Sequence, residues 1–145
     1  MKDFFSKIDA QIVKQQKIKS EVGMTKEQNE VFFSNVVQRL TPVLEEYVQQ
    51  LTERKIKVTH LSKPTYMSIE LKYRDGGHYC LSLGTNITTG RIEFTKFFTS
   101  DDGKNYTSTD GISYTGTTWD DSIFTKQIEN LIQDFVYYAD RHQGF

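Results

Sequence analysis

The sequence predicts an α+β protein: N-terminal helices, then an antiparallel β-meander of four to five strands, then a C-terminal helix packed on the sheet. Three observations support this order. Apolar residues recur at helical spacing up to about residue 55, they alternate with polar residues from about 56 to 117, and helical spacing then returns. The length of 145 residues fits one domain over 1–145, in which residues 1–22 can form a separate amphipathic helical arm.

The N-terminal segment is expected to contain two or three helices. Its first apolar stripe consists of Phe4, Phe5, Ile8, Ile12 and Val13. Thr25 with Gln28 three residues later has the pattern of a capping box, which predicts that a new helix begins there. A second stripe follows in steps of three and four residues, with Pro42 inside it. Since proline removes a helical hydrogen bond, either the helix kinks at Pro42 or Thr41 caps a separate helix that runs to Lys55.

Residues 56–117 are rich in β-branched and aromatic residues and in turn-forming Gly and Asp. The clearest hairpin turns at residues 75–77, whose sequence DGG supplies glycine for a three-residue loop. Because apolar side chains must face apolar side chains, this loop predicts a register. The predicted pairs are Tyr73 with Tyr79, Leu71 with Leu81, and Ile69 with Leu83. The same pairing places His78 and Cys80 together on the wetter face of the sheet.

The C-terminal segment predicts one helix that begins after Asp120. With Asp120 as N-cap, Trp119 and Phe124 stand at the positions of a hydrophobic staple. The apolar side chains then step by four, three, four and three residues: Phe124, Ile128, Leu131, Phe135 and Tyr138. A single stripe of this kind indicates that the helix lies on the sheet, and Gly144 is expected to end it.

Composition excludes several classes of function. The net charge is -1, from 18 basic and 19 acidic residues, so we expect no nucleic-acid partner, which would require a basic excess. We expect no membrane span, because no stretch approaches the ~20 apolar residues that a span needs. The single cysteine cannot form an internal disulfide, and the first residues do not resemble a signal peptide. A cytoplasmic location is therefore expected.

We also expect no metal and no cofactor. The histidines His60, His78 and His142 fall in three different segments, and no H-x-x-x-H spacing occurs. The glycine motifs of phosphate-binding loops are missing, and strands do not alternate with helices as nucleotide-binding folds require.

His78 and Cys80 are the pair most suggestive of catalysis. A cysteine nucleophile needs a base within hydrogen-bonding distance, but residues two apart on a strand have Cα atoms about 6.5 to 7 Å apart. Lys72 on the same face could favour a thiolate on Cys80. No oxyanion-hole loop is recognisable nearby. We therefore favour a hairpin without catalytic function, although this interpretation leaves open whether the protein is an enzyme.

Two functional hypotheses remain. The first is a non-catalytic protein-binding or adaptor module of bacterial or phage type, with a homodimer as one arrangement. Its partner-binding residues are Phe4, Phe5, Ile8 and Ile12. This stripe must pack on its own domain, on a second copy or on a membrane surface.

The second hypothesis is a small-molecule-binding protein or enzyme with a pocket between the sheet and the helices. The candidate lining residues are Tyr66, His78, Cys80, Phe97 and Trp119. Aromatic residues crowd the segment from Phe97 to Trp119, and a strand there would place one of Phe97 and Phe98 on the wetter face. The contrary interpretation is that both sheet faces are covered, the second by the N-terminal helices.

Overall fold

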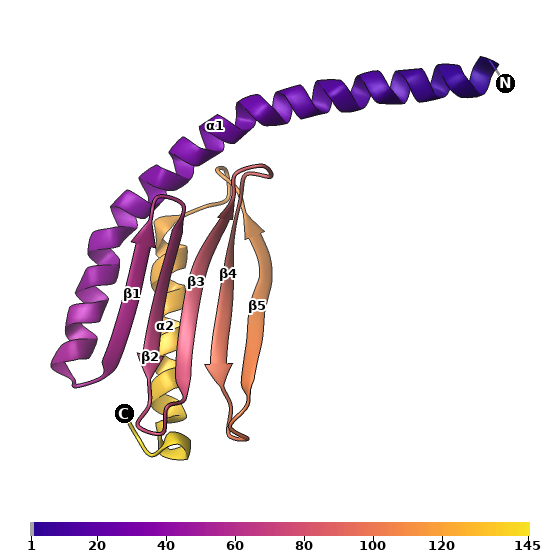
Figure 1. Ribbon diagram of the computed structural model, residues 1–145. Coiled ribbons are helices and arrows are strands. Elements are labelled where there is room, and N and C mark those ends of the chain that lie inside the picture. Colours follow the sequence, from indigo (N-terminus) through magenta and orange to yellow (C-terminus); the bar gives the residue numbers. More distant parts are fainter. Residues whose placement is uncertain (1) are drawn as a thin grey trace.

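The computed structural model describes the backbone of residues 2–145 and the side chains of residues 2–15 and 26–145. Along the chain, one α-helix precedes a five-stranded sheet and another follows it, which confirms the α+β class (Figure 1). In chain order the elements are α1 (Lys2–Glu53), β1 (Lys57–Lys63), β2 (Tyr66–Lys72), β3 (His78–Asn86), β4 (Arg91–Thr99), β5 (Asn105–Tyr114), α2 (Asp121–Tyr137) and the short 3-10 helix η1 (Ala139–His142). The strands lie in sequence order and each pairs antiparallel with the next, so the predicted meander is also confirmed.

Both helices cover the same face of the sheet. Leu44 of α1 and Phe124 of α2 line one small interior space with Ile69 of β2 and Leu81 of β3. The buried side chains of both helices belong to a single apolar core with those of the strands. The interpretation that the N-terminal helices cover the second face is therefore wrong. That second face, here called the open face, carries the alternate strand residues, including Glu70, Cys80, Ser82, Thr95 and Phe97.

The described N-terminal segment is one helix of 52 residues rather than two or three. The backbone stays helical through Thr25, so the predicted helix start there is wrong, and the Thr25 side chain lies outside the described side chains. Pro42 also lies inside the helix. Thr41 does not act as an N-cap, because its hydroxyl donates a hydrogen bond back to the carbonyl oxygen of Val37 at 2.7 Å. The chain leaves α1 through Lys55, which has a positive φ of 62°.

The β2–β3 hairpin has a different register from the predicted one. The observed pairs are Leu71 with Tyr79, Ile69 with Leu81, and Met67 with Leu83. The loop is residues 74–76, closed by the Tyr73 N–H donating to the Gly77 carbonyl at 2.8 Å, and Gly76 takes the left-handed φ of 91°. Moving the loop by one residue changes every partner but leaves each side chain on its predicted face.

The C-terminal helix begins as predicted and ends earlier. The Asp120 carboxylate accepts a hydrogen bond from the Ser122 N–H at 2.8 Å, so Asp120 is the N-cap. α2 ends at Tyr137 rather than at Gly144, and the chain continues into η1. This short helix brings the C-terminus back to the β2–β3 hairpin, where the Arg74 N–H donates to the Gly144 carbonyl.

Candidate functional site

Three of the five predicted ligand-binding residues lie together on the open face. His78 and Cys80 of β3 and Phe97 of β4 line one shallow depression, and Cys80 is the cross-strand partner of Phe97. The other residues around it are Glu70, Asn105, Tyr106 and Thr107. These positions meet because alternate residues of neighbouring strands share a face. The depression is on the side away from the helices, not between the sheet and the helices.

The other two predicted lining residues lie elsewhere. Tyr66 begins β2, opposite Gly84 of β3. Trp119 packs beside Phe94 and Tyr114, with ring centroids 6.0 and 5.8 Å away. The Trp119 indole also donates a hydrogen bond to Asp121 at 2.9 Å. Trp119 thus anchors the start of α2.

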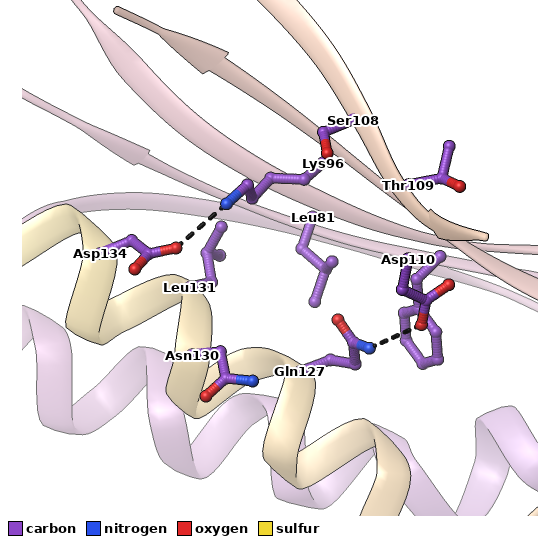
Figure 2. Close-up of a pocket in the computed structure, with 10 residues that line it drawn as sticks. Leu81, Lys96, Ser108, Thr109, Asp110, Gln127, Asn130, Leu131 and Asp134 are labelled. Carbon is purple, nitrogen blue, oxygen red and sulfur yellow. Dashed lines mark hydrogen bonds and ion pairs between the residues drawn. The ribbon is translucent and has the colours of Figure 1, made fainter. Parts of the chain in front are cut away.

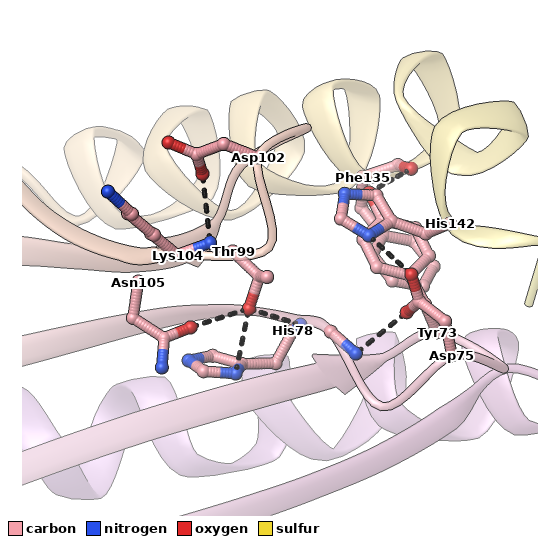
Figure 3. Close-up of polar contacts among 10 residues, drawn as sticks. Tyr73, Asp75, His78, Thr99, Asp102, Lys104, Asn105, Phe135 and His142 are labelled. Atoms are coloured by element: carbon pink, nitrogen blue, oxygen red, sulfur yellow. Dashed lines mark hydrogen bonds and ion pairs between the residues drawn. The ribbon is translucent and has the colours of Figure 1, made fainter.

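His78 is held by Thr99 rather than by Cys80. The His78 backbone N–H donates to the Thr99 hydroxyl at 3.1 Å, and the ring Nδ1 lies 3.3 Å from the same oxygen (Figure 3). Thr99 in turn donates to the Asn105 side chain at 2.7 Å. In the described part of the chain, no hydrogen bond joins His78 to Cys80. The pair therefore lacks the geometry of a nucleophile and its base.

The electrostatic environment of Cys80 disfavours a thiolate. Burial raises the pKa of the Cys80 thiol, and the negative charge of Glu70, directly across the strand pair, raises it further. Lys72 lies 3.4 Å from the Glu70 carboxylate. The expectation that Lys72 would favour a thiolate is therefore wrong, and Cys80 is a poor nucleophile at neutral pH.

A second cavity lies between α2 and strands β3 to β5, on the side of the sheet where a pocket was expected, but none of the five predicted lining residues borders it (Figure 2). It has a volume of about 340 Å³ and combines buried apolar side chains with polar ones. Its lining includes Leu81, Phe94, Leu131, Lys96, Asp110, Gln127 and Asp134. Two polar links join its walls: Lys96 lies 3.0 Å from the Asp134 carboxylate, and the Gln127 amide donates to Asp110 at 3.0 Å. Lys96 interrupts the apolar positions of β4, and this interruption is the sequence signal that could have indicated the cavity.

A buried cluster at the C-terminus has a structural character. His142 is 2% exposed, and its Nδ1 lies 2.9 Å from the Asp75 carboxylate (Figure 3). Its ring stacks on Tyr73, whose hydroxyl donates to the Phe135 carbonyl at 2.6 Å. The pKa of Asp75 is lowered, first by the hydrogen bond from the Gly77 N–H and then by His142. This cluster joins the hairpin turn to the C-terminus.

Metal and membrane chemistry receive no support from the described residues. Among them, no group of three or more His, Cys, Asp or Glu side chains is placed to hold a metal ion. In the same part of the chain, no helix combines the length and the apolar character needed to cross a membrane.

The first half of α1 extends beyond the sheet (Figure 1). The side-chain amide of Asn29 donates a hydrogen bond to the Ile87 carbonyl at 2.9 Å, in the turn between β3 and β4. Residues 2–28 are here called the projecting segment; at 1.5 Å per residue they span about 40 Å. The predicted partner-binding residues lie on it without cover: Phe4 is 60%, Phe5 54% and Ile12 47% exposed, and Ile8 is half-buried.

Comparison with protein-family models, with curated proteins and with solved structures finds no match for this chain.

Proposed function

We propose that this protein is a non-catalytic protein-interaction module that associates with a second copy of itself through the projecting segment of α1. The observation that carries the proposal is the apolar stripe Phe4, Phe5, Ile8 and Ile12 on a helix that extends beyond its own domain. Exposed apolar side chains gathered on one helix face gain free energy when a partner removes them from water.

A second copy fits this stripe better than a membrane surface does. Basic amphipathic helices that lie on membranes need an excess of Lys and Arg on their polar face. Here Asp3 and Asp9 are interspersed with Lys2, Lys7 and Lys14, so the polar face carries both signs of charge. Mixed charges beside a narrow apolar stripe are typical of helices that pair with other helices.

The chemistry of the open face supports a non-catalytic protein. Cys80 has a raised pKa, and His78 is engaged with Thr99. The single cysteine and the protonated thiol suit a reducing compartment, so a cytoplasmic location is part of the proposal.

The test uses the full chain with Phe5→Ser and Ile8→Ser combined. These residues lie outside the core, so the variant is expected to keep its fold while association weakens at least tenfold. Sedimentation velocity over a range of protein concentrations measures the change. Val31→Ser is the matched control, because Val31 is 62% exposed on the same helix but lies outside the projecting segment.

Circular dichroism checks that both variants keep the helical and strand content of the wild type. A wild-type protein that stays monomeric at several hundred micromolar would refute the proposal. Equal weakening by Val31→Ser would also count against it, because the stripe would then have no special part in association.

A second candidate function rests on the cavity beside α2. Its apolar wall at Leu81 and Phe94 and its polar links at Lys96 and Gln127 are the mixture of groups that small polar ligands use. Native mass spectrometry of the purified protein tests this. A bound mass that Lys96→Met removes would support a ligand site, and a spectrum without extra mass would favour the interaction module alone.

A further inference from the structure

We infer that two copies of the chain pair through their projecting segments in an antiparallel arrangement, in which Phe5 of each copy faces Ile8 of the other. This inference rests on the proposed self-association and adds its geometry. The argument uses the positions of apolar and charged residues between Lys2 and Ile12, all of which the structure describes as part of α1.

The stripe has the spacing of a short coiled coil. Phe5 and Ile12 are seven residues apart, and Ile8 lies between them at a step of three and then four. These are the two apolar positions of a heptad repeat. In the inferred register, Phe5 of each copy faces Ile8 of the other, and Ile12 extends the apolar contact at each end.

The charges beside the stripe select the register. Lys2 and Asp9 are one heptad apart on the same flank, and both are exposed. In the inferred pairing Lys2 of each copy lies beside Asp9 of the other, which gives two opposite-charge contacts across the symmetric pair. Displacement by one heptad would instead bring the two Asp9 carboxylates together, and like charges at such positions repel.

A parallel pair would not use these charges. In that arrangement Asp9 would lie beside Phe4 of the other copy, and Lys2 would have no flanking partner. Antiparallel pairing also directs the two sheets away from each other. Each domain begins at the Asn29 contact, many residues beyond the stretch that overlaps.

The contact area sets the expected strength. Only four apolar side chains from each copy enter the contact. The surface area that they bury is well below the ~800 Å² per partner of a standard interface. We therefore expect a reversible dimer whose population changes over roughly the micromolar concentration range.

Charge reversal tests the register. Lys2→Asp and Asp9→Lys are each expected to weaken self-association roughly tenfold, because each replaces two attractions with two repulsions. The double variant restores both contacts with reversed signs and should associate like the wild type. An equimolar mixture of the two single variants should form a heterodimer, since the first then carries only carboxylates at these two positions and the second only ammonium groups.

Neither change breaks a pair within the helix, because no oppositely charged residue lies three or four positions from Lys2 or Asp9. Lys14→Asp is the matched control, since Lys14 is exposed on the same segment but lies away from the stripe. It should leave the dissociation constant unchanged within about twofold. Sedimentation velocity and native mass spectrometry give the constants and identify the heterodimer.

The outcomes separate the inference from the function on which it rests. A dimer that Phe5→Ser and Ile8→Ser disrupt, but that ignores both charge reversals, overturns the antiparallel register and leaves self-association standing. A wild-type chain that does not associate at all overturns both. Rescue by the double variant, together with the heterodimer, supports the inferred pairing.

Discussion

The imidazole ring of His142 stacks on the ring of Tyr73, with centroids 4.2 Å apart and planes 3° from parallel. On its other side Tyr73 stacks on Phe135, also at 4.2 Å. One tyrosine, directly after the end of β2, thus lies between α2 and the C-terminal 3-10 helix, and it joins the β2–β3 hairpin to the last element of the chain. Stability in this region depends on contacts between residues that are distant in sequence.

Removal of the His142 ring should therefore destabilise the protein. We expect His142→Ala to lower the free energy of unfolding by about 2–4 kcal/mol, because the change leaves a cavity beside Tyr73 and frees Asp75. Urea denaturation monitored by fluorescence measures the loss. His60→Ala is the control, since His60 is exposed on β1 and should change stability little. Equal effects of the two changes would contradict this role of His142.

Asp75 should make stability depend on pH in the acidic range. Its pKa is lowered in the folded protein, so its contribution is present above the unfolded value and is lost as pH falls through the folded one. Wild-type stability is thus expected to fall between about pH 5 and pH 2, with Asp75 contributing to the slope. Asp75→Asn should flatten that slope in urea titrations at several pH values. An identical slope would show that Asp75 does not contribute.

Gly77 is expected to tolerate no side chain. A Cβ atom at this position would lie 2.9 Å from Nδ1 of His142 and 3.0 Å from the Asp75 carboxylate. Gly77→Ala should cost about 1–3 kcal/mol of stability, as overpacking usually does. Gly116→Ala is the control, because a Cβ there meets nothing within 4 Å. Equal midpoints of thermal unfolding for the two variants would contradict the close approach.

Glu70 should control the reactivity of Cys80. Since the Glu70 carboxylate raises the pKa of the thiol, Glu70→Gln is expected to lower that pKa and to speed alkylation by iodoacetamide a few-fold at pH 7.5. Glu93→Gln on β4 is the control, because it removes the same charge. The Glu93 carboxylate accepts a hydrogen bond from Ser113 and does not raise the pKa of Cys80. Mass spectrometry measures the rate of Cys80 alkylation in the wild type and in both variants. Unchanged rates in Glu70→Gln would show that burial alone sets the pKa.

Sequence patterns predict which face a strand residue occupies more reliably than which residue it faces. Alternation has a period of two, so it assigned Leu71 and Tyr79 to the core and Cys80 to the open face. Loops of residues 75–77 and of 74–76 both place apolar opposite apolar. Only the backbone decides between them, because Gly76 takes the positive φ.

The continuity of α1 was not predictable from its local signals. Thr41 and Pro42 have the sequence of a helix start, yet the Thr41 hydroxyl bonds back to Val37 and the helix continues. Apolar packing on the sheet from Phe33 to Leu51 outweighs the missing hydrogen bond at Pro42.

The sites were predictable only in part, for a related reason. His78, Cys80 and Phe97 share a face by alternation, so their convergence follows from the strands. Trp119 lies in a connection, where no periodicity assigns a face. The cavity beside α2 exists because two helices leave part of the face over β4 and β5 uncovered, and sequence does not give the relative widths of sheet and helices.

The unbroken course of α1 also fixes a length. In the inferred pair, Asn29 of one copy lies 45 helical positions from Asn29 of the other, which corresponds to about 68 Å along the helix axis. The paired helices would then hold the two identical sheets at a fixed distance from each other. Targets repeated at a matching spacing would be held by both sheets at once, with a gain in avidity that a single domain lacks.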